Sequence, residues 1–421
     1  MEKEVKKVPE LRFPGVDGGW KQCRLDNLFS IFNGYAFSSD DSQESGCRWV
    51  KIADVGINIM KEKNLSYLPY NFRDKHQKFV LKATDYVVAL TRPILGGKLK
   101  IAKVGQKFDG ALLNQRVGKL VSENQCEYVY HFLQRSRVIN IIENRIAGTD
   151  PPNLSPSEVG SLKTYVPGLP EQQKIASFLS AVDKKIEQLT RKKELLEQYK
   201  KGVMQKIFSK EIRFKPAQSE VEGDDNGQNY PDWEEKRFGD IFNRITTKNN
   251  ENNQNVLTIS AQLGLINQQE FFNKSVSASD VSGYYLLKKG DFAYNKSYSK
   301  GYPMGAIKRL RRYEKGVVST LYICFAIKGD DSPEYFEEFL DFGGINRELH
   351  KIAQEGARNH GLLNMSVVEF FNDVVITTPS ILEQNKISKF LRSLSKRIHS
   401  AKKKLEQTQK FKKGLLQKMF V

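Results

Sequence analysis

Residues 169–209 read LPEQQKIASFLSAVDKKIEQLTRKKELLEQYKKGVMQKIFS, and residues 381–421 read ILEQNKISKFLRSLSKRIHSAKKKLEQTQKFKKGLLQKMFV. The two segments align without a gap, and 16 of their 41 positions are identical. A gapless match of this length indicates an internal duplication. A weaker match lies upstream, where WKQCRLDNLF at residues 20–29 aligns with WEEKRFGDIF at residues 233–242. The sequence therefore predicts a repeated unit, in which a globular region is followed by a helical segment.

Both segments carry an apolar repeat of seven residues, which is typical of a coiled coil. One chain supplies two such helices, so we expect them to pack against each other. An antiparallel pair connects most simply to both globular regions. The residues predicted to form this coiled-coil or partner interface are Ile175, Leu179, Val182, Ile186, Leu189 and Leu196 in the first segment, and Ile387, Leu391, Leu394, Ile398, Leu405 and Leu415 in the second.

Composition indicates a folded, basic protein. The chain has 421 residues, a formal net charge of +18 and an apolar fraction of 39%. The mean hydropathy is −0.52 and the pI is near 9.4, which favours a polyanionic partner, nucleic acid first. Residues 171–210 and 383–421 hold +15 of the +18 charges; a basic rod of this kind either contacts DNA or acidic proteins, or is simply solvated. No apolar stretch follows the basic N-terminal residues, and the four cysteines lie far apart, so we expect a cytoplasmic location.

The globular regions mix strand and helix signals. Residues 86–90 and 317–327 are rich in β-branched and aromatic residues and predict strands, whereas residues 128–144 and 333–342 predict helices. Residues 216–230 have the composition of a linker. Two loops combine glycine with basic and hydrogen-bonding side chains, which suit phosphate and base-edge contacts, although a solvated loop has a similar composition. The candidate DNA-binding residues are Arg92, Lys98, Lys100, Arg116, Lys296, Ser299, Lys300 and Tyr302.

Enzymatic motifs are weak in this sequence. Residues 150–153 (DPPN) resemble an amino-methyltransferase motif, but that motif needs an aromatic fourth residue to stack on the flipped base. Residues 231–236 (PDWEEK) place the acids of a nuclease-like pattern too close together, and residues 96–98 (GGK) lack the spacing of a phosphate loop. The five histidines show no metal-ligand spacing. We therefore expect no catalytic residues and no metal on this chain.

The duplicated helices resemble those of the specificity subunits of type I restriction–modification systems. The residues that carry the resemblance are the segment LPEQQKIA at 169–176, the helix ending KKGVMQKIFS, the second copy of both, NGYAF at 33–37 and Asn153-Leu154-Ser155. The resemblance covers essentially the whole chain. It implies an α+β fold, in which two mixed α/β target-recognition domains are separated by two long helices that form an antiparallel coiled coil with a pseudo-twofold repeat.

The resemblance also implies boundaries: a first target-recognition domain at 1–168, a helical spacer at 169–210, a linker at 211–229, a second domain at 230–380 and a second spacer at 381–421. It implies a non-catalytic subunit of a prokaryotic defence system that reads a bipartite, asymmetric DNA sequence. Two modification (methyltransferase) subunits and two restriction (motor and nuclease) subunits would bind it. No cofactor is expected on this chain; S-adenosylmethionine, ATP and Mg²⁺ are expected on the partners.

Two alternatives stay open at this point. A self-sufficient methyltransferase or nuclease with fused recognition domains would need a cofactor loop or an acid cluster, which the sequence lacks. A coiled-coil adaptor would leave the two basic, aromatic-rich globular regions without a role.

Overall fold

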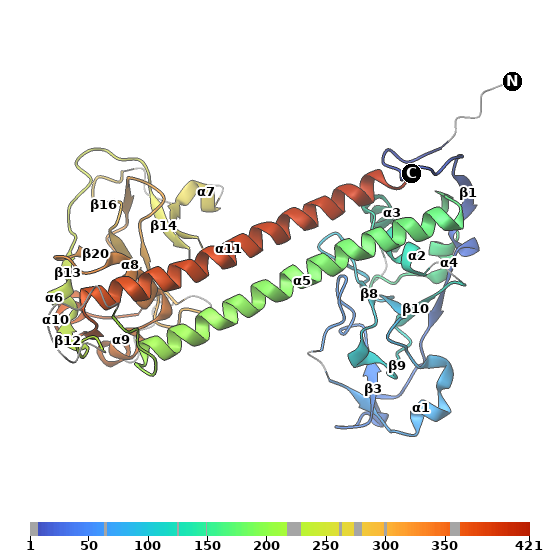
Figure 1. Cartoon of the computed structure of the whole chain (residues 1–421), viewed down its shortest axis with the longest axis horizontal. Coiled ribbons are helices and arrows are strands. Elements are labelled where there is room, and N and C mark those ends of the chain that lie inside the picture. The colour runs from blue at the N-terminus through green and yellow to red at the C-terminus, as the bar shows by residue number, and fades with distance from the viewer. Residues whose placement is uncertain are drawn as a thin grey trace. The chain divides into compact units, whose positions relative to one another are not determined.

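The computed structural model describes residues 7–62, 65–123, 126–148, 150–216, 229–260, 263–272, 280–298, 301–353 and 363–421. The chain divides into two compact units: unit 1 comprises Met1–Lys192 and Ala401–Val421, and unit 2 comprises Lys193–Ser400. The two long helices are α5 (Leu169–Phe208) and α11 (Ile381–Lys418) (Figure 1). Each unit therefore contains a part of both helices. The predicted α+β class with two long helices is confirmed.

Unit 1 is built around an antiparallel sheet with the strand order β2-β10-β5-β8. These strands are β2 (Ser30–Asn33), β10 (Val117–Val121), β5 (Tyr86–Ala89) and β8 (Ile101–Lys103). Strand β5 confirms the strand predicted at residues 86–90 and is buried on both faces. Because successive side chains of a strand point to opposite faces, Tyr86 and Val88 enter one hydrophobic cluster, and Val87 and Ala89 enter another.

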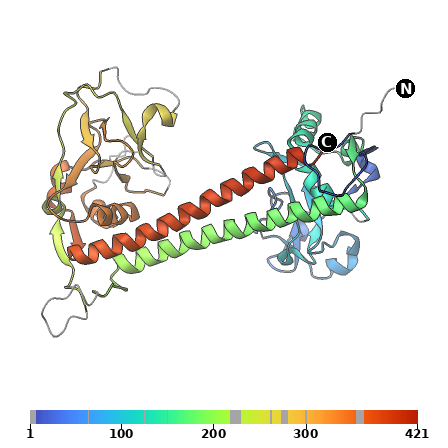
Figure 2. The ribbon, with the colours of Figure 1, turned by 45° about the horizontal axis from the view of Figure 1, so that its top comes forward.

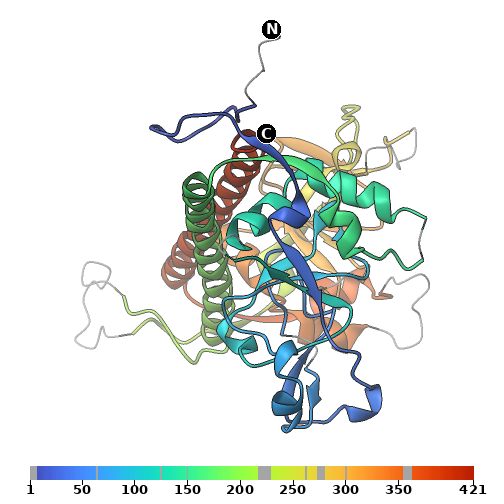
Figure 3. The same cartoon turned by 90° about the vertical axis from the view of Figure 1, so that its right-hand side faces the viewer.

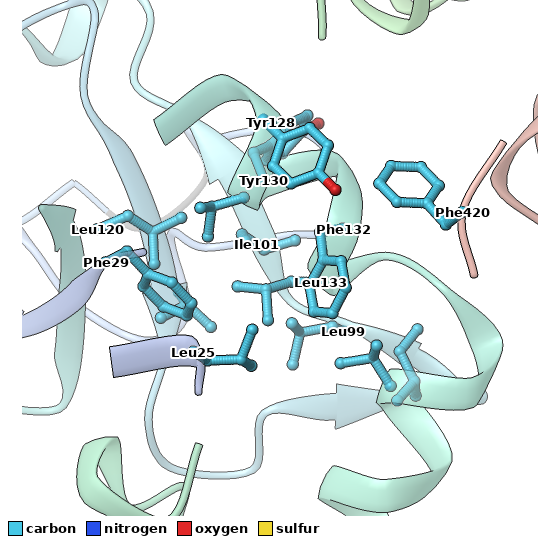
Figure 4. Packing of buried hydrophobic residues seen from close by; sticks show 14 of the residues in the cluster. Leu25, Phe29, Leu99, Ile101, Leu120, Tyr128, Tyr130, Phe132, Leu133 and Phe420 are labelled. Carbon is cyan, nitrogen blue, oxygen red and sulfur yellow. The ribbon is translucent and has the colours of Figure 1, made fainter. Parts of the chain in front are cut away.

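Helices and a second strand pair cover one face of this sheet. The core there contains Tyr128 and Phe132 of α2 (Cys126–Leu133) together with Leu25 and Phe29, and Phe420 packs against the same core (Figure 4). The helix predicted at 128–144 is wrong in one respect, because it is split into α2 and α3 (Ser136–Ile146). The remaining elements on this side are β1 (Lys21–Arg24), the 3₁₀ turn η1 (Leu25–Asn27), α4 (Pro156–Gly160) and β11 (Lys163–Val166), with β1 paired to β11.

Short elements cover the other face of the sheet in unit 1. They form a three-stranded sheet of order β4-β3-β9. Their bounds are η2 (Ser39–Asp41), β3 (Cys47–Val50), β4 (Tyr67–Leu68), α1 (Phe72–Lys75), η3 (Gln77–Phe79), η4 (Gln106–Phe108) and β9 (Leu112–Leu113). The hairpin of β6 (Ile94–Leu95) and β7 (Lys98–Leu99) belongs to the first face, because Leu99 lies in the same cluster as Tyr128 and Phe132.

Unit 2 contains a sheet of order β13-β20-β17-β18 and the pair β12-β21. The predicted helix at 333–342 is confirmed as α8. The strand predicted at 317–327 is wrong as one element, because it forms two strands that pair with different partners: β19 with β16, and β20 with β13 and β17. The bounds are β12 (Glu234–Arg237), α6 (Phe238–Ile241), β13 (Phe242–Arg244), β14 (Leu257–Ser260), β15 (Gly264–Asn267), α7 (Gln268–Phe272), β16 (Tyr285–Lys288), β17 (Phe292–Asn295), β18 (Ala306–Arg309), β19 (Lys315–Val318), β20 (Ile323–Ile327), α8 (Pro333–Phe342), α9 (Asn346–Ile352), α10 (Val367–Asn372) and β21 (Val375–Thr378).

The two units share one framework. The strand order β2-β10-β5-β8 corresponds element by element to β13-β20-β17-β18, and β1-β11 corresponds to β12-β21. Three helices, α2 to α4 or α8 to α10, precede the last strand in each case. The segments before the central strand differ: residues 34–85 carry β3, β4 and α1, whereas residues 245–291 carry β14, β15, α7 and β16. A common framework therefore presents two different inserted segments.

Each unit also repeats an arginine clasp on the first turn of its long helix. In unit 1, Arg12 donates from Nε and Nη2 to Glu171 of α5, both at 2.8 Å. In unit 2, Arg213 donates to Glu383 of α11 at 3.2 and 2.7 Å. The clasp residues lie in ELRF (10–13) and EIRF (211–214), a repeat that the sequence analysis missed. These contacts fix the start of each helix against the globular part of its unit.

Two lysines pair the long helices inside the units. Lys412 of α11 bonds Asp183 of α5 and also Gln134 in unit 1. Lys200 of α5 bonds Ser395 of α11 and also Glu338 in unit 2. Lys412 and Lys200 occupy equivalent positions of the repeat, as do Asp183 and Ser395. α5 and α11 run side by side in opposite directions where these contacts form (Figure 2).

The residues of the predicted apolar seam point inward to different extents. Five of them lie in the cores of the globular parts: Ile175, Leu179, Ile387 and Leu391 near the helix starts, and Leu415 near the end of α11. Further along the helices the seam is thinner. Leu189, Leu394 and Leu415 are buried, and Val182, Ile186, Leu196, Ile398 and Leu405 are half-buried.

The start of the described chain lies beside the end of α11 in unit 1. The amide of Leu11 donates to the carbonyl of Lys418 at 2.8 Å, and Lys418 pairs with Glu10 (Figure 3). Unit 2 repeats this arrangement, since Ile212 donates to the carbonyl of Lys206 and Lys206 pairs with Glu211. The predicted linker continues from here, and its residues 217–228 lie outside the described residues.

Candidate nucleic-acid interface

The basic loop of unit 1 is a tight hairpin. Gly96 and Gly97 connect β6 to β7 with φ values of +56° and +68°, as a type I′ turn requires. Lys98 begins β7 and is exposed, whereas Lys100 just beyond it is half-buried. The two glycines are therefore needed for the turn, Lys98 lies on its return strand, and Lys100 follows that strand.

Arg92 precedes this hairpin in an uncommon backbone conformation. Its φ is +48°, in the left-handed region that non-glycine residues rarely adopt. The loop at 151–153 holds it there: the amide of Arg92 donates to the carbonyl of Pro152 at 2.7 Å, and Thr91 donates from Oγ1 to Oδ1 of Asn153 at 2.7 Å. Strain of this kind is retained at binding and catalytic sites more often than elsewhere. The DPPN segment thus has a structural task, which is to orient Arg92.

Three positive charges gather beside the hairpin. Burial lowers the pKa of the Lys100 ammonium, and the nearby charges of Lys61 and Arg92 lower it further. Lys61 belongs to a loop that is held on β8, because the amide of Asn58 donates to the carbonyl of Ile101 at 2.8 Å. An anion bound here would relieve the mutual repulsion of the three cations, so the cluster Lys61, Arg92 and Lys100 is suited to a phosphate.

Arg116 approaches the same end of the sheet. Its carbonyl accepts a hydrogen bond from the amide of Leu90 at 2.9 Å, two residues before Arg92. Its amide donates to Oδ1 of Asn114 at 3.0 Å, and its side chain is exposed. The structure therefore brings together all four unit 1 candidates near the end of β5. Lys61 was missed in the sequence because only the loop contact through Asn58 places it there.

The candidates of unit 2 are arranged differently. Lys296 follows β17, and its carbonyl accepts from the amide of Leu363 at 3.0 Å. Tyr302 donates its hydroxyl hydrogen to Asp341 at 3.0 Å and accepts from Lys308 at 3.0 Å. Burial raises the pKa of Tyr302, and its hydroxyl is therefore engaged toward α8. Ser299 and Lys300 lie outside the described residues.

Metal and membrane sites are absent from the described chain. No group of three or more His, Cys, Asp or Glu side chains within the described ranges could hold a metal ion. No helix in the described ranges is long and apolar enough to span a membrane.

Comparison with known proteins gives a match to one protein family. Residues 17–198 match the type I restriction modification DNA specificity domain. This part of the chain is similar to that specificity domain. The matched region covers the framework of unit 1 and most of α5, so the resemblance noted from the duplicated helices is confirmed. The second set of framework strands in unit 2 repeats the strand order of the specificity domain.

Individual relatives agree with the family match. The chain is 29% identical over 215 residues to the type I restriction enzyme MjaVIII specificity subunit of Methanocaldococcus jannaschii, covering 50% of this chain and 49% of the relative. It is 32% identical over 101 residues to the EcoAI specificity subunit of Escherichia coli, covering 24% of this chain and 17% of the relative. The chain thus spans about half the length, or less, of the curated relatives it matches.

Two solved structures share the fold. The type I restriction–modification S subunit from M. genitalium matches with a TM-score of 0.60 at 15% identity, covering 99% of both chains. A chain from a structure described as the basis of complex assembly and conformational transition of the type I R-M system matches with a TM-score of 0.51 at 15% identity, covering 96% of this chain and 98% of that chain. At this identity the likeness concerns the fold alone.

Proposed function

We propose that this chain is the DNA sequence-specificity subunit of a type I restriction–modification enzyme and that it has no catalytic activity of its own. The observation that carries the proposal is the repeated framework with unlike inserted segments. Two such units suit a bipartite, asymmetric target, in which each unit reads one part of the DNA sequence. The family match of residues 17–198 supports DNA sequence specificity as the task.

The chemistry would then reside on partner subunits in the cytoplasm. Two modification subunits would use S-adenosylmethionine to methylate adenine, and two restriction subunits would use ATP and Mg²⁺ to move along DNA and cleave it. The enzymatic motifs that the sequence lacks are therefore supplied by other chains. This proposal disfavours both a self-sufficient methyltransferase and an adaptor that does not touch DNA.

An exchange of residues 10–160 for those of a relative with a different target tests this proposal. We expect the assembled enzyme to methylate a sequence in which one half-site has changed and the other is unaltered. The matched exchange of residues 230–370 should change the other half-site. Methylated positions are mapped by sequencing DNA after reaction with each chimera. Changes in both half-sites from a single exchange, or in neither, would contradict independent reading by the two units.

Substitutions in the unit 1 cluster test how DNA is held. Arg92→Ala is expected to cost about 1–3 kcal/mol on the cognate site and to relax one position of the target, because a guanidinium can bond guanine in a bidentate manner. Lys100→Ala should weaken binding to every sequence and reduce the salt slope by about one, as loss of a phosphate contact does. Fluorescence anisotropy with cognate and scrambled duplexes across a salt series measures both effects.

The control for these substitutions is Lys21→Ala, which removes an exposed charge on β1 outside the cluster. Its affinity and salt slope should equal those of the wild type. If Arg92→Ala and Lys100→Ala also keep wild-type affinity and slope, the cluster faces solvent and does not bind DNA.

A further inference from the structure

Five rings gather in the inserted segment of unit 1. Tyr35 follows β2, and its ring centroid lies 4.6 Å from that of His76, 4.9 Å from Phe37 and 5.3 Å from Phe79. His76 follows α1, and its ring also lies 5.0 Å from Phe37 and 5.3 Å from Phe72. We call these five residues the aromatic cluster. It includes the start of α1, which lies at the end of unit 1 away from α5 (Figure 1).

Two members of the aromatic cluster are not explained by packing of the core. Phe37 is 8% exposed and belongs to a buried group with Trp49 and Leu68. Tyr35, in contrast, is 42% exposed, and His76 is half-buried. Among the described residues, no side chain or backbone group forms a hydrogen bond with the ring nitrogens of His76 or with the hydroxyl of Tyr35. An open phenol ring and an unbonded imidazole therefore lie side by side, where a ligand can reach them.

One turn of the chain joins the aromatic cluster to the basic candidates. The amide of Tyr35 donates to the carbonyl of Leu113, and its carbonyl accepts from the amide of Gln115, both at 2.9 Å. Gly34 allows this close approach, because a Cβ atom there would lie 2.3 Å from the carbonyl oxygen of Leu113. The next residue, Arg116, is one of the basic candidates near the end of β5, and both Gln115 and Arg116 are exposed. The aromatic cluster thus continues the candidate DNA-binding surface.

The chemistry of this pair of side chains matches one base. In the major groove, thymine presents the acceptor O4 beside its C5-methyl group. An imidazole N–H can donate to O4, while the face of a phenol ring packs against the methyl group. Cytosine presents a donor and no methyl group, and guanine presents two acceptors and no methyl group. An apolar ring beside a single donor therefore fits thymine best.

The inserted segment of unit 2 presents different groups after its first framework strand. Lys248 follows β13, and its ammonium lies 4.5 Å from the ring centroid of Tyr285. The same ammonium donates to the carbonyl of Gly283 at 2.7 Å. A cation engaged with a ring thus lies in this segment, whereas an open phenol beside an imidazole follows β2 in unit 1. Such a difference is what the reading of two unlike half-sites requires.

We propose that Tyr35 and His76 read one thymine of the half-site recognised by unit 1. The ring of Tyr35 contacts the C5-methyl group, and His76 donates a hydrogen bond to O4. The neighbouring cations Lys61, Arg92 and Lys100 hold the phosphates of the same duplex. The proposal rests on the proposed function and deepens it, because it assigns a base to particular side chains of this chain.

Duplexes with deoxyuridine in place of thymidine test the proposal, because this exchange removes only the methyl group. Each thymidine of the mapped unit 1 half-site, on either strand, is replaced in turn, and the affinity of the assembled enzyme is measured by fluorescence anisotropy. We expect one replacement to weaken binding by the wild type about fourfold, the loss that corresponds to one buried methyl group. Tyr35→Ala should bind that duplex and the unmodified duplex equally well. Tyr35→Phe keeps the ring and should behave as the wild type.

The hydrogen bond from His76 has a separate test. His76→Phe keeps a ring in the aromatic cluster but has no donor. It should remain sensitive to deoxyuridine at the position found above. It should also lose the wild-type preference for thymine over 5-methylcytosine at this position, because 5-methylcytosine keeps the methyl group and replaces O4 with a donor. A full preference retained by His76→Phe would overturn the role of the imidazole.

Tyr70→Ala is the matched control. Tyr70 belongs to the same inserted segment and is 72% exposed, and its ring contacts no other aromatic ring of the described chain. This variant should keep the wild-type response to deoxyuridine. If it loses the response as Tyr35→Ala does, the assignment to Tyr35 is wrong.

The measurement on the wild type needs no variant and therefore does not depend on the folding of Tyr35→Ala. A unit 1 half-site without an A·T pair, or wild-type affinity for every deoxyuridine duplex, would overturn the reading of thymine. A response that Tyr35→Ala retains would do the same. Each of these results leaves the proposed function intact. An assembled enzyme that shows no preference for any DNA sequence would instead overturn the proposed function itself.

Discussion

Replacing Arg213 with methionine is expected to lower the free energy of unfolding by about 3 kcal/mol, because it leaves a buried carboxylate without its cation. Glu383 is fully buried at the start of α11 and accepts from Arg213 and from Nε1 of Trp233 at 3.1 Å. The indole alone cannot replace the charge and the two hydrogen bonds of the guanidinium. Urea denaturation followed by circular dichroism measures the loss.

Two comparisons make this result specific to the clasp. Arg24→Met removes an exposed arginine that pairs with Asp26, and it should leave the melting temperature unchanged. The double variant Arg213→Met with Glu383→Met removes both charges and should recover part of the loss, since no buried charge is left uncompensated. A single variant as stable as the wild type would show that solvent, and not Arg213, compensates Glu383.

Acidification is expected to destabilise unit 1 through His131. This side chain is fully buried, and burial together with the charge of Lys412 holds its pKa well below the usual 6.5. Asp183 lies 3.8 Å from Nδ1, but Lys412 already binds that carboxylate at 2.7 Å, so the imidazole is neutral. The unfolded state therefore binds the additional proton, and stability falls by about 1.4 kcal/mol for each pH unit below 6.5 until the folded pKa is reached.

The variant His131→Gln isolates this contribution from that of other acidic groups. Its amide can still reach Ser180, which lies 3.0 Å from Nε2 in the wild type. Above pH 7 the variant shows only the cost of the altered packing, and between pH 6.5 and 5 its stability should change less steeply than that of the wild type. Parallel slopes in denaturation series across this range would mean that His131 is protonated in the folded state.

Local sequence patterns were enough to predict the long helices and α8, because the hydrogen bonds and the apolar face of a helix both come from residues close together in the sequence. The two long helices follow from heptads and a gapless repeat, and α8 follows from the apolar face of residues 333–342 with Ser332 as its cap. The prediction of a single strand at 317–327 was wrong. Both halves of this segment have the composition of a strand, so composition alone does not show where one strand ends and the next begins. Only the strands beside them decide that β19 joins β16 and β20 joins β17.

Long-range contacts explain the other differences. The helix predicted at 128–144 breaks at Arg135, whose guanidinium donates to the carbonyl of Val421 at 2.6 Å and lies over the ring of Phe420. Those residues are far away in the sequence, and no local pattern indicates them. The cluster around Lys100 is a similar case. The sequence indicates the basic hairpin, but it does not indicate that Lys61 lies beside it. The clasps could have been found, because ELRF and EIRF each precede a repeated tryptophan segment.

The two units share α11, and the last residues of this helix belong to unit 1. During synthesis, unit 2 can therefore complete its fold before unit 1 does. Leu415, Met419 and Phe420 belong to the same core as Tyr128 and Phe132, yet they are translated more than two hundred residues after β11. Unit 2 is a continuous stretch and has all of its residues before they emerge. Domains of a nascent chain usually fold from the N-terminus onward. Here unit 1 is translated first, but its core stays exposed to solvent until the end of α11 is made. Chaperones can bind this apolar surface in the meantime, and unit 1 is the last to complete its fold.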